Sequence, residues 1–267
     1  MVSSFVDSNY IFSNIKVITL EKRKEYISKV LTRLGLNYTL FDAILGKDLD
    51  LQEMTLQGIL DKHHTFKNAN EVACYLSHIT CVKEFYENQS ADTLFIFEDD
   101  IEYNKDSVAS VKKCMEEVPS DWELINFGRC WASCYGESQG SRAVKSNDFL
   151  CSHSYAINKS GAKKILDNSF PAKVPLDVFY KDLCNTQSQN PIISYVSSPR
   201  IFQQKRAGNS EEFASSLQNN DSCQECKSVV PIFWDILKVA TVLVIVLLAI
   251  YLINNQAFQK LFSKRKV

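Results

Sequence analysis

The sequence predicts an α/β fold, and two features carry this prediction. The first is a β-α-β pattern near the N-terminus: an apolar run at 15–20, an amphipathic helix at 21–34 ended by Gly35, and a second apolar run at 38–43. Such a unit places two parallel strands together with a right-handed crossover. The second is Leu94–Phe97, four consecutive apolar residues that are typical of a strand buried on both faces. With 267 residues, 45% of them hydrophobic, the chain is long enough for one α/β domain and an appendage.

The other elements follow from the same patterns in chain order. Residues 49–68 are polar and irregular, and His63 and His64 are expected there in a solvated loop. The stretch 129–148 is expected to be a long loop that either lines an acceptor site or is merely mobile. Helices are expected at 70–88, 105–118, 162–168 and 177–184, and strands at 122–128, 151–158 and 192–196.

Charge and cysteine content narrow the functional class. The net charge of −1 gives no indication of a nucleic-acid partner. The nine cysteines are an odd set, and a single Cys-x-x-Cys at Cys223 and Cys226 is weak support for zinc. The cysteine usage therefore favours a reduced compartment. Four cysteines lie in apolar patterns, where cysteine is usually a small buried hydrophobe: Cys74, Cys81, Cys114 and Cys151.

Three consecutive acids follow the buried strand, at the edge where α/β proteins bind ligands. Because side chains alternate along a strand, Glu98 and Asp100 are expected on one side and Asp99 on the other. Two carboxylates on one side form a hard-oxygen site suited to Mg²⁺ or Mn²⁺ carrying a diphosphate. The alternative is an ordinary acidic turn.

The helix expected at 70–88 carries a second candidate group. Spacings of three and four residues place Cys74, Ser77, His78 and Cys81 on one face. His78 is then either a core histidine satisfied by a hydrogen bond or a residue of the active site.

Short blocks of sequence occur in a characteristic order between residues 15 and 210. In order and spacing they resemble glycosyltransferase family 25, the lipooligosaccharide and procollagen galactosyltransferase group. The blocks are Ile18-Thr19-Leu20, Phe41-Asp42-Ala43, Gly46-Lys47-Asp48-Leu49, Cys74-Tyr75-Leu76-Ser77-His78, Glu98-Asp99-Asp100, Asp121-Trp122, Phe127-Gly128, Tyr155-Ala156-Ile157, Ser160-Gly161-Ala162 and Pro175-Leu176-Asp177.

The resemblance implies a GT-A-like nucleotide-diphospho-sugar transferase fold and the transfer of a hexose, expected to be galactose, from a UDP-sugar. The expected acceptor is a hydroxyl of a glycan, a lipid-linked glycan or a protein, and similarity to the inverting family members implies a single in-line displacement. Two departures are Thr19, where the family usually has Asn, and Tyr26, where it usually has Arg. They leave open a catalytically inactive relative acting as a membrane-tethered binding protein. Another metal-dependent nucleotide-transferring enzyme is a further alternative.

The resemblance also assigns roles to the candidate residues. Asp100, together with Glu98, is expected to hold Mn²⁺ or Mg²⁺. Asp177 is the expected base for the acceptor hydroxyl, with a helix N-cap as its alternative, and His78 is the second catalytic candidate. Donor-binding residues are expected to be Glu98, Asp99, Arg23 and Gln203.

The C-terminal part predicts a membrane anchor. Residues 239–253 are apolar and uncharged, cover about 22 Å as a helix, and reach a full span when extended back to Ile232. We therefore expect a single-pass protein in contact with the lipid bilayer. A cytosol-facing catalytic domain is favoured because 1–14 lacks a signal-peptide pattern; the basic tail and four glycosylation sequons would fit a lumenal orientation. The predicted organisation is an N-terminal extension at 1–14, a glycosyltransferase domain at 15–210, a linker at 211–228, a transmembrane helix with its flank at 229–255 and a basic tail at 256–267.

Overall fold

The computed structural model describes most of the chain up to residue 205 and two short segments beyond it. The described residues are 12–88, 90–132, 134, 141–187, 189–205, 224–226, 240–248 and 250–251. Contacts divide the chain into two units, residues 1–226 and residues 227–267.

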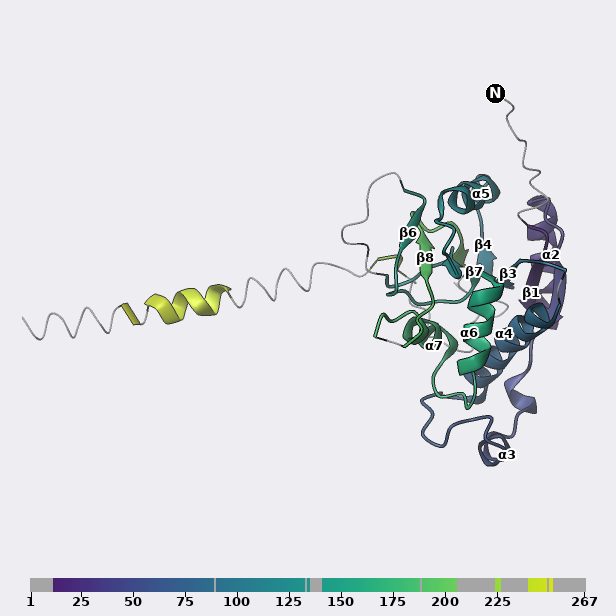
Figure 1. The fold of residues 1–267 in the computed structure, drawn as a ribbon, viewed down its shortest axis with the longest axis horizontal. Helices are drawn as coiled ribbons and strands as arrows, with labels where there is room; N and C mark the ends of the chain where they lie inside the picture. Colours follow the sequence, from purple (N-terminus) through teal and green to yellow (C-terminus); the bar gives the residue numbers. More distant parts are fainter. Residues whose placement is uncertain are drawn as a thin grey trace, which may run out of the picture. The chain divides into compact units, whose positions relative to one another are not determined.

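The first unit is built on a mixed sheet of seven strands (Figure 1). β1 is parallel to both β2 and β3, and β5 is parallel to β8, whereas β7 runs antiparallel to β3 and β5 and β6 runs antiparallel to β8. The predicted α/β fold and the parallel pairing of its first two strands are thus confirmed. In spatial order the strands are β2 (Thr39–Asp42), β1 (Ile15–Thr19), β3 (Thr93–Glu98), β7 (Ser154–Asn158), β5 (Leu124–Asn126), β8 (Ser194–Ser197) and β6 (Ala143–Lys145).

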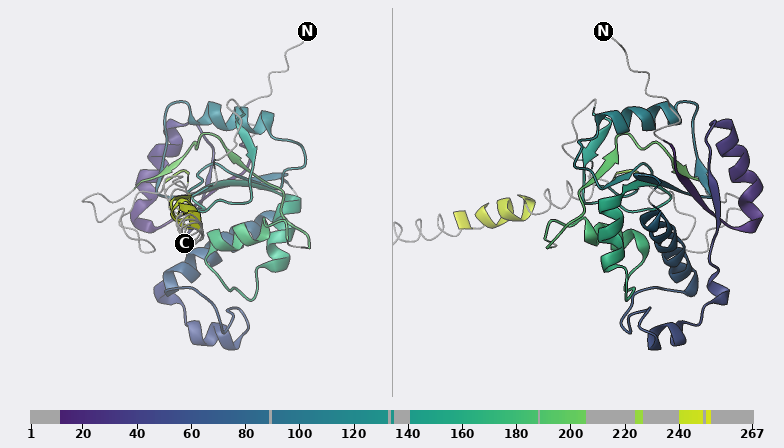
Figure 2. Two further views of the ribbon diagram at one scale, coloured as in Figure 1. Left: turned by 90° about the vertical axis from the view of Figure 1, so that its left-hand side faces the viewer. Right: turned by 45° about the vertical axis from the view of Figure 1, so that its right-hand side comes forward.

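Helices cover both faces of this sheet (Figure 2). One face packs against α2 (Lys24–Arg33) and α5 (Ser107–Glu117), and the other against α4 (Ala69–Glu87), α6 (Lys159–Asn168) and α7 (Leu176–Leu183). β3 contributes to both cores. Its residues Phe95 and Phe97 join the α2 and α5 side, while Leu94 and Ile96 join the α4 side, as expected of a strand buried on both faces.

Several short elements complete the unit. β4 (Ile101–Glu102) pairs antiparallel with β9 (Gln203–Gln204) in a separate small sheet. β6 lies inside the stretch expected to be a loop, because a three-residue strand is defined by its partner rather than by its own pattern. The remaining elements are the 3₁₀ helices η1 (Glu21–Arg23) and η2 (Gly46–Asp48) and the helix α3 (Leu51–Leu56).

Two disulfides join segments on the β5 side of the unit. Cys130 is bonded to Cys151, and Cys134 is bonded to Cys226. Cys151 is therefore half of a disulfide rather than the buried free thiol that its apolar pattern suggested. The second disulfide, together with backbone pairing of Ala132 with Cys226, attaches residues 224–226 to the sheet domain.

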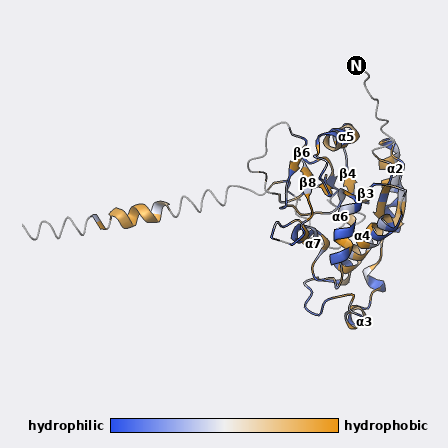
Figure 3. Cartoon of the chain, in the orientation of Figure 1, coloured by the Kyte–Doolittle hydropathy of each residue, from blue (hydrophilic) through white to orange (hydrophobic). Residues whose placement is uncertain are grey.

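The second unit contains a short apolar helix. Residues 240–248 and 250–251 are helical, and the coloured hydropathy shows their apolar character (Figure 3). Within the described residues, no helix is long and apolar enough to cross a membrane. The predicted single-pass anchor is therefore wrong on this finding, and the bilayer contact and the cytosolic or lumenal orientation that depended on it lose their basis. Ile232, from which a full span was expected, lies outside the described residues.

Candidate active site

A cavity of about 300 Å³ opens at the carboxyl ends of β1 and β3. The segment after β2 forms one wall, and α4 forms another. Ser77 ties these walls together, since its hydroxyl accepts a hydrogen bond from the Ile44 N–H at 3.0 Å. Gly46 allows the close approach, because a Cβ there would lie 2.4 Å from Asn70 Oδ1. The lining combines apolar Ile18, Ala43, Ile44 and Leu45 with polar Asn70, Ser77, His78 and Glu98.

Glu98 is the last residue of β3, and its side chain faces α4. The Ser152 hydroxyl donates a hydrogen bond to Glu98 Oε1 at 3.0 Å, and His78 Nε2 lies 3.4 Å from the same oxygen. Burial acts to raise the pKa of Glu98, but the imidazoles of His78 and His153 and the Ser152 hydroxyl outweigh it and hold the pKa below its usual value. Glu98 is thus kept as a carboxylate at the cavity.

His78 is fully buried in α4 and also lines the cavity. Its Nδ1 lies 3.0 Å from the Tyr155 hydroxyl, which in turn lies 2.9 Å from the Tyr180 hydroxyl. These contacts, from β7 and α7, fix the orientation of the ring. The interpretation of His78 as a hydrogen-bonded core histidine therefore agrees with the structure, and its role in an active site stays a prediction.

Asp99 faces the opposite direction, as strand alternation predicts. Its buried carboxylate accepts a hydrogen bond from the Leu20 N–H at 2.6 Å and another from the Arg23 guanidinium at 2.8 Å. Arg23 is itself buried. The pair connects the end of β3 to the turn after β1, so Arg23 forms an internal ion pair at the edge of the cavity.

Asp100 lies just beyond β3, where the small sheet brings residues 203–205 alongside. Its backbone carbonyl accepts a hydrogen bond from the Lys205 N–H at 2.5 Å. The Gln204 amide lies 3.5 Å from Asp100 Oδ2, whereas Gln203, the residue expected to bind the donor, is exposed on β9. The Lys205 ammonium lies 4.2 Å from the centre of the ring of Tyr26, a residue of α2. The segment after β9 therefore also contacts α2.

Asp177 lies in the first turn of α7, one residue inside the helix. The N-cap is Pro175, so Asp177 is not the cap that its alternative interpretation proposed. The Cys151 N–H lies 3.5 Å from Asp177 Oδ2. Burial raises the pKa of Asp177, and the charge of Glu98 raises it further. The structure thus brings Asp177 near the carboxylate of Glu98, although the two are 79 positions apart in sequence.

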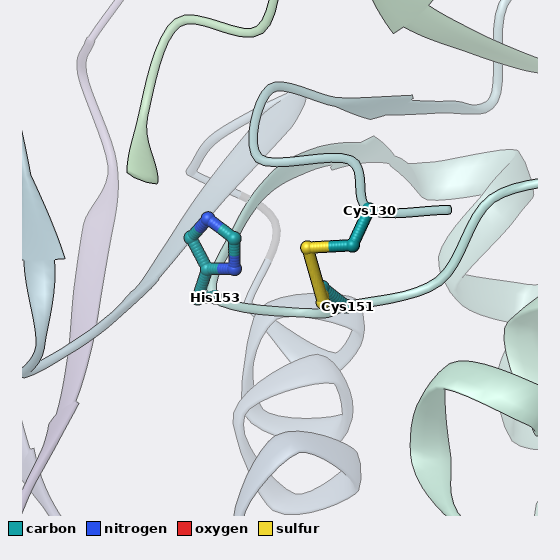
Figure 4. A group of neighbouring side chains, drawn as sticks. All are labelled: Cys130, Cys151 and His153. Carbon is teal, nitrogen blue, oxygen red and sulfur yellow. A yellow bond between two sulfur atoms is a disulfide. The ribbon is translucent and has the colours of Figure 1, made fainter. Parts of the chain in front are cut away.

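The segment just before β7 supplies residues that the sequence analysis missed. Ser152 contacts Glu98, and the carbonyl of His153 accepts a hydrogen bond from the Glu98 N–H at 2.9 Å. Figure 4 shows the His153 ring beside the disulfide between Cys130 and Cys151. A polar run at the start of an apolar strand, Cys151-Ser152-His153-Ser154, was the available signal.

Comparison with known proteins identifies relatives of this chain. Residues 12–144 match the family described as "Glycosyltransferase family 25 (LPS biosynthesis protein)". The chain is 29% identical over 209 residues to procollagen galactosyltransferase 1-A of Xenopus laevis, a match that covers 71% of this chain and 34% of the relative. It is 26% identical over 185 residues to "Probable inactive glycosyltransferase 25 family member 3" of Bos taurus, covering 63% of this chain and 31% of that protein.

The sequence matches identify the family of this chain. The chain belongs to glycosyltransferase family 25. It spans about a third of the length of the curated relatives it matches.

A solved structure of a Drosophila β1,4-galactosyltransferase 7 mutant, in complex with manganese, UDP-Gal and xylobiose, is also similar. It shares 9% identity and a TM-score of 0.33, and the match covers 77% of each chain. A TM-score of this size is too low to support a conclusion about this chain.

Proposed function

We propose that the domain transfers a hexose, galactose first among the candidates, from a UDP-sugar to a hydroxyl of a glycan, lipid-linked glycan or protein. A GT-A type of donor binding is part of this proposal. The observation that carries it is the cavity at the carboxyl edge of β1 and β3, which Glu98 lines, with Asp100 two residues further along the chain. Family membership supports the same reaction class.

The acidic motif fits a divalent cation. Glu98 and Asp100 offer carboxylate oxygens, the ligands that Mn²⁺ and Mg²⁺ prefer. When bound, such a cation supplies Lewis-acid stabilisation of the leaving diphosphate. Around it, Ser152 and His78 hold the Glu98 carboxylate, and the Gln204 amide lies near Asp100.

The donor nucleotide is proposed to occupy the cavity. Its apolar wall at 43–45 suits a flat base, and its polar residues suit ribose hydroxyls. Arg23 then acts by positioning Asp99 and the turn after β1, because its guanidinium is already paired. Gln203, exposed on β9, remains a candidate contact from the opposite rim.

Asp177 is proposed as the general base for the acceptor hydroxyl. Its raised pKa makes its carboxylate a stronger proton acceptor than an ordinary aspartate. The neighbouring carboxylate of Glu98 contributes to that shift, so the two acids serve different roles within one site.

The test is a Mn²⁺-dependent assay of UDP-galactose hydrolysis and transfer with Asp100→Asn. We expect a loss of at least about 10²-fold in turnover without loss of the fold, because several kcal/mol of transition-state stabilisation depend on that ligand. Glu102→Gln, an exposed acid on β4, is the matched control and should retain activity. Near-normal turnover of Asp100→Asn would contradict the assignment.

A second candidate is a catalytically inactive binding protein. The relative named as inactive, together with Thr19 and Tyr26 in place of the residues usual in the family, supports it. Such a protein would show a thermal shift with UDP-galactose and Mn²⁺ but no turnover. Turnover of other nucleotides in the same assay would instead indicate a different nucleotide-transferring enzyme.

A further inference from the structure

The cavity contains a second group of potential metal ligands, distinct in chemistry from the acidic pair. Cys74 and His78 lie one turn apart on α4, and Glu98 reaches them from the end of β3. Their ligand atoms, a thiol sulfur, a ring nitrogen and a carboxylate oxygen, all lie within 4.8 Å of one another. All three residues line the cavity.

His78 provides an independent indication of a ligand. Its Nε2 is buried and makes no hydrogen bond in the described structure, although Glu98 Oε1 is 3.4 Å away. Most buried polar atoms in folded proteins make a hydrogen bond, so a buried nitrogen without one at a cavity needs an explanation.

The other ring nitrogen is already held in the way that metal-bound histidines require. Nδ1 lies 3.0 Å from the Tyr155 hydroxyl, and Tyr155 contacts the Tyr180 hydroxyl. Binding of a metal at Nε2 requires the tautomer that carries its proton on Nδ1, and the cation then takes the place of the Nε2 proton that faces Glu98 Oε1 in the metal-free site. Outer hydrogen bonds of this kind orient metal-ligating histidines and fix their tautomer.

We propose that Cys74, His78 and Glu98 form a binding site for Zn²⁺ or another borderline-soft divalent cation. A set of one sulfur, one nitrogen and one oxygen matches zinc sites with three protein ligands and an open fourth position. The open position would face the cavity. Mg²⁺ and Mn²⁺ favour all-oxygen sets, so this site differs from the proposed Glu98 and Asp100 pair.

Zinc binding would release a proton and would affect the acidic pair. On binding, the Cys74 thiol releases its proton to solvent and ligates as the thiolate. Because Glu98 is common to both sets, Zn²⁺ should compete with Mn²⁺ for the site. The zinc site itself does not depend on the proposed glycosyl transfer.

The test is Co²⁺ titration of the full-length protein, without thiol reductant so that the disulfides among the described residues stay closed. We expect a one-to-one complex with a near-ultraviolet thiolate-to-cobalt band. Cys74→Ser should remove the band and weaken binding at least about 10-fold, and His78→Gln should weaken binding by a similar factor. Cys114→Ala on α5 removes a buried free thiol elsewhere and should leave the band unchanged.

Asp100→Asn separates this site from the acidic pair. It should abolish Mn²⁺-dependent transfer yet keep the cobalt band, so the two proposals can fail independently. Absence of the band in the wild type, its persistence in Cys74→Ser, or its loss in Asp100→Asn would overturn the zinc site. A second measurement needs no variant: Zn²⁺ should protect Cys74 from alkylation, read by peptide mass spectrometry, and an unprotected Cys74 would equally overturn it.

Discussion

Replacing Asp99 by Asn should destabilise the fold through Arg23. The Asp99 carboxylate accepts hydrogen bonds from the Leu20 N–H at 2.6 Å and from Arg23 at 2.8 Å. The side chains of Arg23 and Asp99 are 9% and 7% exposed, so solvent screens their interaction little. The neutral amide removes the negative charge that the buried Asp99 carboxylate places beside the guanidinium.

The expected magnitude follows from this burial. Removing one partner of a buried ion pair costs about 3–5 kcal/mol. The amide oxygen of Asn can still accept one of the two hydrogen bonds, which places the Asp99→Asn variant at about 3 kcal/mol. For a domain of this size, each kcal/mol lowers Tm by about 2–4 °C, so Tm should fall by about 6–12 °C.

The assay is urea unfolding at neutral pH, with thermal unfolding as a second measurement. Glu102→Gln, an exposed acid nearby, is the control and should unfold as the wild type does. The double variant Arg23→Met with Asp99→Leu should recover part of the loss, because it removes both charges together. A change below about 0.5 kcal/mol in Asp99→Asn, within the range of ordinary surface substitutions, would refute the argument.

Three further predictions concern the base, the packing of α6 and the response to acid. Asp177→Asn should lower kcat by about 10²- to 10⁴-fold with donor affinity unchanged. The wild-type rate should fall as pH drops through a pKa above the usual aspartate value. A parallel loss of donor affinity in Asp177→Asn would exclude the base role. Gly161→Ala should lower the free energy of unfolding in urea by about 1–3 kcal/mol, because the new Cβ would lie 2.3 Å from the Glu123 carbonyl oxygen. The control is Lys163→Ala, at an exposed position on the same helix. A stabilised Gly161→Ala would show that α6 can shift without cost. Burial acts to raise the pKa of Glu123, but hydrogen bonds, led by that from Lys164 at 2.7 Å, hold the pKa below its usual 4.5. The ionised Glu123 therefore stabilises the folded state above pH 4.5, and this contribution is lost as pH falls through the lower pKa of the folded state. Unfolding free energies measured from pH 7 to pH 3 should therefore decline less in Glu123→Gln, and an unchanged decline would contradict this.

The site was only partly predictable from the sequence. Alternation along β3 correctly assigned Glu98 and Asp99 to opposite sides, because side-chain direction in a strand is a local property. The donor role expected of Arg23 stays a prediction, whereas the ion pair of its guanidinium with Asp99, 76 positions away, could not be seen in the sequence. The membrane anchor was inferred from hydropathy alone, and no helix in the described part of the chain is long and apolar enough to cross a membrane.

Local pattern by itself determined the long elements of this protein. The apolar runs at β1 and β3 and the long helix α4 are visible in the sequence because burial imposes a period of two or of 3.6 on consecutive residues. The tertiary structure alone decided which distant groups meet. Ser152 reaches Glu98, Cys130 bonds Cys151, and β9 exists because β4 lies beside it. Each of these contacts joins segments whose separation in the chain carries no periodic signal, so only the folding of the sheet and its connections brings them within reach.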